Sequence, residues 1–342
     1  EFLKGETILG IVLTHAHEDH IGALPWLMPQ LKAPLYATPF TTYLIREKLR
    51  DQGVLNGVKI NEVPLGGTIN LGPFEIELVS MAHSIAEPNG LAIRTPLGTV
   101  LHTGDWKVDP DPVVGHKTDS AALTRIGDEG VLAMVCDSTN VFVDGRAGSE
   151  GDVAVAMAQL IKPLKGRVAV GCFASNVARV HSVVRAAEAA GRRVVLAGRS
   201  MHRITAAARH VGLLDDLPPF LTEDEARIWP ADQILYLCTG SQGEARAALS
   251  RVADGTHPFI KLGLGDHCIF SSRVIPGNEL AIGALQDRLA DRGVRLYTER
   301  DHPGIHVSGH PCRDELKDMY DWVRPRIAVP THGVRRFLME HA

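Results

Sequence analysis

The sequence predicts an α/β protein in which a second domain, built on a parallel sheet flanked by helices, is inserted into the first. Two observations carry this prediction. Short apolar runs alternate with amphipathic runs from about Gly166 onward, which is the rhythm of βαβ units. Candidate metal ligands follow strand-like runs both before this region and after it, so the chain is expected to return to the first domain at its end.

Length and composition support two domains. A chain of 342 residues with 45% hydrophobic content can bury a large core, and its length is typical of two domains. We assign residues 1–146 and 311–342 to the first domain and residues 147–310 to the second. Near residues 145–151 the sequence changes from mainly strand-like runs to alternating strand-like and helix-like runs. No apolar run approaches about eighteen residues and no signal peptide opens the chain, which favours a cytoplasmic protein without a membrane segment.

Five cysteines are scattered without a Cys-x-x-Cys pair, and most lie in or beside apolar runs, which favours buried free thiols. The net charge of −4 argues against general adhesion to nucleic acid. It leaves room for local binding of nucleic acid, because bound metal ions add positive charge of their own.

The first expected element is a buried strand over residues 8–13, which is apolar except for one glycine. It runs directly into a loop with His15, His17, Asp19 and His20 within six consecutive positions. His15 and His17 can reach one metal ion, and Asp19 and His20 can turn toward a second. Neutral imidazole and carboxylate together suit Zn²⁺, with Mn²⁺ or Fe²⁺ as alternatives.

Three further candidate ligands each follow an expected strand. His83 comes after the alternating run 74–79, Asp105 after residues 99–101 and His332 after residues 326–329. A rigid sheet can hold side chains from such positions over one point. Each residue alone has an ordinary loop role as its alternative, but the three in this order reinforce the histidine loop.

The remaining elements fall into two regions. The first region reads as a meander of strands with few helices, up to the strand at 131–136. The second region alternates strands and helices: strands are expected at 168–172, 194–197, 234–238, 269–271 and 294–297, and helices at 177–187, 201–211, 244–252 and 279–290.

The motifs together resemble a known family. The pattern His-x-His-x-Asp-His, a single later His, a Gly-Asp and a late His resembles the metallo-β-lactamase fold. Segments 136–140, 308–310 and 331–333 are similar to the additional motifs of its β-CASP branch, which processes nucleic acids. Segments 173–176, 238–244, 271–279 and 306–310 resemble bacterial ribonuclease J, and the resemblance covers nearly the whole chain. It implies an αββα sandwich with an inserted β-CASP domain.

The resemblance also implies a ligand set and a cofactor. His15, His17 and His83 would hold one metal ion, Asp19, His20 and His332 the other, and Asp105 would bridge them. The expected cofactor is two Zn²⁺ per chain, with Mn²⁺ as the alternative. Two bridged ions can activate water and stabilise both oxygens of an in-line displacement at phosphorus. The alternative for Asp19 and His20 is that they hydrogen-bond to the ligands without binding a metal ion themselves. One of the two metal positions would then be weakly filled.

A general acid for the leaving oxygen is implied in the same way. His310 matches that role, and Asp137 would orient it or fix its protonation state. A histidine titrating near neutral pH suits the task, and a neighbouring carboxylate raises its pKa. The alternative for His310 is a structural hydrogen bond within its turn.

Several loops are expected to hold phosphate. Ser175 and Asn176 follow a strand and open a helix, and Ser241 lies in a second loop of the same kind. Plain N-capping is the alternative for Ser175 and Asn176. The resemblance places Ser175, Asn176 and Ser308 near a pocket for the 5′-terminal phosphate of RNA, one nucleotide from the metal ions. His306 has the weaker case, with shaping of the loop as its alternative.

The implied activity is metal-dependent hydrolysis of single-stranded RNA, 5′-to-3′ from a 5′-monophosphate, with additional internal cleavage. Two other functions stay open: a thioester or lactone hydrolase on the same fold, and a non-catalytic RNA-binding subunit of a processing complex. The preference for RNA over DNA depends on the resemblance.

The chain also departs from the family pattern. Ala86 stands where the family usually has proline. Strands expected before the histidine loop and segments expected after His332 are absent, so the resemblance implies a chain shortened at both ends. The family forms homodimers or higher oligomers, and the state of this chain stays open.

Overall fold

The computed structural model describes residues 6–342, which form two compact units. Of the described residues, unit 1 comprises 6–148 and the segment Gly309–Ala342, and unit 2 comprises Ser149–Ser308. The expected α/β fold, with an αββα sandwich and a second unit on a parallel sheet, is confirmed.

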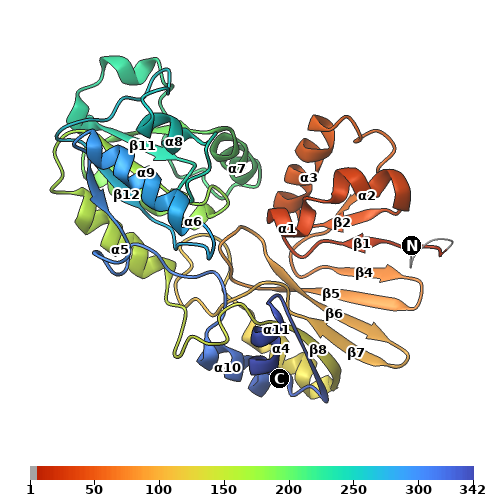
Figure 1. The fold of residues 1–342 in the computed structure, drawn as a ribbon. Coiled ribbons are helices and arrows are strands. Elements are labelled where there is room, and N and C mark those ends of the chain that lie inside the picture. The colour runs from red at the N-terminus through yellow and green to blue at the C-terminus, as the bar shows by residue number, and fades with distance from the viewer. Residues whose placement is uncertain (1–5) are drawn as a thin grey trace. The chain divides into compact units, whose positions relative to one another are not determined.

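Unit 1 contains two sheets packed on one another (Figure 1). The smaller is parallel, with β1 (Ile11–Val12), β2 (Leu35–Ala37) and β3 (Ile60–Glu62) in that order. The larger has six strands in the order β14-β8-β7-β6-β5-β4. Their bounds are β4 Thr68–Leu71, β5 Phe74–Ser80, β6 Asn89–Thr95, β7 Gly98–His102, β8 Val131–Asp137 and β14 Ile327–Thr331.

Helices cover the outer faces of these two sheets. On the smaller sheet lie α1 (Glu18–Ile21), α2 (Leu24–Leu31) and α3 (Pro39–Asp51), and on the larger lie α4 (Ser120–Glu129), α10 (Arg313–Val323) and α11 (Arg335–His341). Alternation along β5 explains the layers. Ile76 and Leu78 enter the core between the sheets, whereas Val79 joins the core under α4 and α10.

The expectation of a meander with few helices in the first region is wrong for its first part. Only β4, β5, β6 and β7 form an antiparallel meander; β1, β2 and β3 are parallel and are joined through α1, α2 and α3. The signal for α3 is a helical stripe of Phe40, Leu44, Ile45 and Leu49, all buried. The strand expected at residues 8–13 is reduced to the two half-buried residues of β1.

Unit 2 is a five-stranded, all-parallel sheet in the order β10-β11-β9-β12-β13. The strands are β9 Val168–Gly171, β10 Arg193–Ala197, β11 Ile234–Cys238, β12 His267–Phe270 and β13 Arg295–Tyr297. Successive residues such as Ala169 and Val170 are both buried, so helices cover both faces. These helices are α5 Glu150–Ile161, α6 Val177–Ala189, α7 Arg199–His210, α8 Ala248–Ala253 and α9 Glu279–Asp291, with two short 3₁₀ turns at Glu225–Ile228 and Ala231–Gln233.

The expected elements of unit 2 are present with one notable difference. The helix expected at 244–252 begins only at Ala248. Gly243 has a φ of 80°, outside the right-handed helical region, so the segment before Ala248 forms turns. All five cysteines are buried free thiols, as expected, and burial raises the pKa of Cys172 to about 12. Within residues 6–342, no helix combines the length and the apolar character that crossing a membrane requires.

Candidate metal centre

The edge of the six-stranded sheet explains why residues distant in sequence meet. Strands β14, β8 and β7 are parallel, and β5 has the same direction because both β5 and β7 pair antiparallel with β6. Their carboxyl ends therefore share one edge. His83 follows β5, Asp105 follows β7, Asp137 ends β8 and His332 follows β14, so four candidate residues are delivered to the same edge.

The histidine loop supplies the other side chains. It leaves β1, and Asp19 and His20 lie in the single turn of α1, for which His17 is the N-cap residue. The His15 ring is fully buried, and its Nδ1 lies 3.0 Å from Thr14 Oγ1. Its Nε2 is buried without a hydrogen-bond partner within the described chain. Buried polar atoms are normally paired, and a metal ion bound to this nitrogen would supply the missing partner.

The side chains gather in two groups whose donor atoms lie within 4.8 Å of one another. One group is His15, His17, His83 and Asp105; the other is Asp19, His20, Asp105 and His332. Asp105 belongs to both groups. Its Oδ2 lies 3.2 Å from His20 Nε2 and 3.3 Å from His332 Nε2. The same oxygen lies 3.7 Å from His15 Nε2 and 3.9 Å from His83 Nε2. The residues thus divide as the family resemblance implies.

Protonation states suit cation binding in the first group. Burial lowers the pKa of His15 and His83 well below the usual value, and it lowers the pKa of His17 to about 4. The imidazoles are therefore neutral near pH 7 and have lone pairs to offer. Burial alone would raise the pKa of Asp105, but the surrounding histidines bring it far below its usual range. An ionised carboxylate among neutral imidazoles fits a divalent zinc-type ion.

The second group is more open and more strongly paired. Asp19 Oδ2 lies 3.2 Å from His332 Nε2, and this bond lowers the pKa of Asp19 to about 2 and raises that of His332 to about 9. His332 has a φ of 55°, a left-handed conformation that is uncommon outside glycine. A metal ion at this position would replace the proton that the two side chains share.

Neighbouring groups orient the ligands. His83 Nδ1 lies 2.6 Å from the carbonyl oxygen of Gly309. A carbonyl only accepts, so Nδ1 carries the hydrogen and Nε2 keeps its lone pair. This Nε2 lies 3.0 Å from His17 Nδ1 and 3.9 Å from Asp105 Oδ2. Bonds like that to Gly309 fix ligand tautomers in metal sites. Thr139 Oγ1 likewise lies 2.8 Å from His332 Nδ1. Sequence reasoning missed Thr14, Gly309 and Thr139 in this role; their only signal is a place within two residues of His15, His310 and Asp137, respectively.

A third group of possible donor atoms, from Asp137, His310 and His332, shares His332 with the second ligand group. His310 Nδ1 is 2.7 Å from Asp137 Oδ2, and the carboxylate of Asp137 is fully buried. Burial opposes protonation of His310, but the charge and hydrogen bond of Asp137 outweigh it and raise the pKa of His310. The His310 ring centroid lies 4.8 Å from that of His83 and 5.4 Å from that of His332. A histidine–carboxylate pair therefore adjoins the candidate ligands.

Unit 2 contains the residues predicted to hold phosphate. Ser175 and Asn176 follow β9, Ser241 follows β11, and His306 and Ser308 lie in the segment after β13. Because the sheet is all-parallel, these segments leave at one edge. Asn176 has a structural role: its Oδ1 caps α6 by accepting from Arg179 N, and its Nδ2 donates to Glu150 Oε1. The capping alternative for Asn176 is therefore what the geometry shows.

Arg179 organises this edge of unit 2 from a fully buried position. Its Nε and Nη2 form an ion pair with the buried carboxylate of Glu150 at 3.1 and 3.0 Å. Its Nη1 donates to Ser271 Oγ at 2.6 Å and lies 3.3 Å from His306 Nδ1. One side chain thus fastens α5, α6, the end of β12 and the loop that carries His306.

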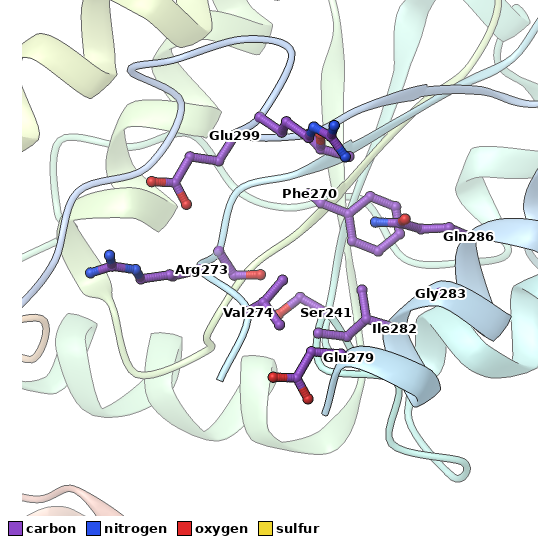
Figure 2. A pocket seen from close by; sticks show the side chains of 12 residues that line it. Ser241, Phe270, Arg273, Val274, Glu279, Ile282, Gly283, Gln286 and Glu299 are labelled. Atoms are coloured by element: carbon purple, nitrogen blue, oxygen red, sulfur yellow. The ribbon is translucent and has the colours of Figure 1, made fainter. Parts of the chain in front are cut away.

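Ser241 lines a cavity of about 590 Å³ near the carboxyl ends of β12 and β13 (Figure 2). Phe270 and Ile282 supply apolar lining, and the charged residues of the lining are Arg273, Arg300, Glu279 and Glu299. Two cations and two anions balance in charge, so the cavity lining does not by itself favour a phosphate.

Three family models match successive parts of the sequence. Residues 3–128 match the beta-lactamase superfamily domain, and residues 165–289 match the beta-CASP domain of ribonuclease J. Residues 302–342 match the Zn-dependent metallo-hydrolase RNA specificity domain. The first and last matches flank the second, as the two segments of unit 1 flank unit 2.

Curated proteins named ribonuclease J match over almost the whole chain. The protein of Sinorhizobium meliloti is 48% identical over 97% of this chain and 59% of its own length. That of Mycolicibacterium smegmatis is 43% identical (98% and 60%), and that of Synechocystis sp. is 39% identical (98% and 53%). The chain therefore spans between 53% and 60% of the length of these relatives.

A solved structure supports the fold alone. A protein of unknown function from Enterococcus faecalis V583 superposes with a TM-score of 0.68 at 18% identity, covering 97% of this chain and 76% of that one.

Proposed function

The chain belongs to the ribonuclease J family, and we propose that it hydrolyses the phosphodiester bonds of single-stranded RNA as a zinc-dependent ribonuclease in RNA processing and decay. One observation carries the proposal. Six ligand-type side chains converge around Asp105, and the Asp137–His310 pair lies directly beside them. The similarity to relatives named ribonuclease J supplies RNA as the substrate class.

We propose that His15, His17, His83 and Asp105 hold one zinc ion, and that Asp19, His20, Asp105 and His332 hold the other. Mn²⁺ is the alternative occupant. Bound zinc would supply Lewis-acid polarisation of the phosphate and a water acidic enough to react near neutral pH. The chain contributes the geometry. Thr14 holds Nδ1 of the buried His15 ring, and Gly309 holds Nδ1 of the buried His83 ring. The Nε2 atom of each ring is thereby kept on the side of Asp105.

His310 is proposed as the general acid. Its Nδ1 is committed to Asp137, so the proton available to a leaving 3′-oxygen is the one on Nε2. The ionised carboxylate of Asp137 favours the charged form of the ring, and it holds the ring in one orientation. The leaving oxygen needs a proton, and His310 can supply it because the ring is protonated before cleavage and neutral afterwards.

We further propose that unit 2 contacts the RNA backbone through Ser175, Asn176, Ser241, His306 and Ser308, and that the enzyme prefers a 5′-monophosphate. The convergence of their segments at one sheet edge supports this assignment. For Asn176 the contact would come from the backbone, because its side chain is already bonded. We also propose a cytoplasmic location and assembly of the whole protein into a homodimer or larger oligomer.

The test is incubation of the zinc-loaded protein with two labelled single-stranded RNAs, one 5′-monophosphorylated and one 5′-triphosphorylated. We expect mononucleotides, released mainly from the monophosphorylated RNA. Internal fragments from both RNAs in equal amounts would contradict the end preference. No cleavage by a monodisperse protein with two zinc ions bound would contradict the ribonuclease assignment and favour a small-molecule hydrolase, which a thioester substrate would then reveal.

A further inference from the structure

Thr139 lies where the Asp137–His310 pair and the second ligand group meet. It stands two residues after Asp137, at the start of the loop that follows β8. Its Oγ1 lies 2.6 Å from Asp137 Oδ1 and 2.8 Å from His332 Nδ1. Its backbone N–H also donates to Asp137 Oδ1, at 2.8 Å. One hydroxyl therefore touches both a buried carboxylate and a candidate metal ligand.

The direction of these bonds follows from the groups involved. A carboxylate oxygen accepts only, so the single hydrogen of the Thr139 hydroxyl is committed to Asp137. The backbone carbonyl of His332 is a second acceptor, but at 3.4 Å it is a much poorer one. With its hydrogen committed, the Thr139 oxygen can only accept from His332, and Nδ1 must carry a hydrogen.

The other nitrogen of His332 is then the one left for a cation. Its Nε2 lies 3.2 Å from Asp19 Oδ2 and 3.3 Å from Asp105 Oδ2, inside the second ligand group. Asp137 cannot take over from Thr139, because His332 Nδ1 lies 3.8 Å from Asp137 Oδ1, beyond hydrogen-bond range. The backbone of His332 is in the left-handed region, a conformation that persists only where surrounding contacts hold it, and the bond to Thr139 is one such contact.

We propose that Thr139 is a positioning residue that fixes the tautomer and direction of His332 and ties this ligand to the Asp137–His310 pair. The proposal rests on the proposed function of the site. The hydrogen-bond order is His332 Nδ1–H to Thr139, Thr139 O–H to Asp137, and His310 Nδ1–H to the other oxygen of Asp137. Each member orients the next, and the single hydroxyl oxygen of Thr139 both donates to Asp137 and accepts from His332.

The test compares Thr139→Val, which keeps the shape and removes the hydroxyl, with Thr139→Ser, which keeps the hydroxyl. Zn²⁺ alone is titrated against a chromophoric chelator. Loss of a hydrogen bond behind a metal ligand costs about 10–100-fold in affinity, so we expect that loss for the second zinc ion in Thr139→Val. Thr139→Ser should bind both ions as the unchanged protein does. Unchanged affinity in Thr139→Val, or an equal loss in both variants, would overturn the proposal.

A second measurement needs no variant of Thr139. Nitrogen-15 spectra of the zinc-loaded protein, labelled at histidine and assigned by comparison with His332→Gln, should show hydrogen on Nδ1 of His332. Hydrogen on Nε2 instead would overturn the proposal even if Thr139→Val failed to fold. If the unchanged protein binds two zinc ions with the expected ranking of variants but cleaves no RNA, the ribonuclease assignment fails and the role of Thr139 stands.

Discussion

Asp137 and His310 are 173 positions apart in the sequence and are joined by a 2.7 Å hydrogen bond between Oδ2 and Nδ1. Asp137 ends β8, which lies next to the edge strand β14 in the six-stranded sheet, and His310 enters unit 1 just after the chain leaves unit 2. The backbone carbonyl of His310 also accepts from Asn140 Nδ2 at 3.0 Å. The returning segment is thus hydrogen-bonded to the end of β8 and the loop after it, at the residue proposed as the general acid.

Replacing His310 by alanine should abolish most RNA cleavage while leaving both proposed zinc sites filled, since His310 belongs to neither group that contains Asp105; it is grouped with Asp137 and His332 instead. Loss of a general acid costs about 10²–10⁴-fold in rate. Single-turnover cleavage of 5′-phosphorylated RNA, with zinc content measured in parallel, checks this. His116→Ala removes an exposed histidine of the same unit and serves as the control. Full activity in His310→Ala would exclude it as the acid.

Replacing Asp105 by alanine should lower the zinc content below two per chain, because Asp105 is the one carboxylate common to both ligand groups. We expect a folded protein with almost no RNA cleavage. Elemental analysis after dialysis and the circular dichroism spectrum provide the two readouts. Asp287→Ala, an exposed acid of α9, is the matched control. Two tightly held zinc ions in Asp105→Ala would contradict the shared-ligand assignment.

Ser175→Ala should reduce trimming from a 5′-monophosphate more than internal cleavage, if this residue contacts the terminal phosphate. A several-fold change in the ratio of mononucleotides to internal fragments is expected on an RNA that permits both. Ser200→Ala, an exposed serine in α7, should leave the ratio unchanged. An equal loss of both activities in Ser175→Ala would remove the phosphate contact and leave a structural role.

Glu150→Gln should destabilise unit 2 strongly, because it leaves the guanidinium of Arg179 buried without its counter-charge. Breaking a buried pair by removing one partner costs about 3–5 kcal/mol. Amide hydrogen exchange in α6 and β12, measured at increasing urea concentrations, reports the lost free energy of unfolding locally. The control is Glu188→Gln, whose pair with Arg185 is solvent-accessible and should contribute less than about 1 kcal/mol. Equal exchange in both variants would show that the buried pair adds nothing.

The local identity of the site could be predicted from the sequence. Residue types and strand ends were enough to find the histidine loop, His83, Asp105 and His332, because metal ligands follow directly from side-chain chemistry. The βαβ region was predicted almost element by element, since strongly periodic segments determine their own secondary structure. The short parallel strands β2 and β3 were missed, because three residues carry too little pattern.

Only the tertiary structure decided which side chains meet. The common direction of β5, β7, β8 and β14 brings Asp105 into both ligand groups, and no local pattern contains that register. The bond from Thr139 to His332 and the ion pair of Arg179 with Glu150 join positions 193 and 29 residues apart. Sequence chemistry determines which atoms can bind or donate. The folded sheet determines their partners, because hydrogen bonds and metal coordination require positions fixed to within a fraction of an ångström.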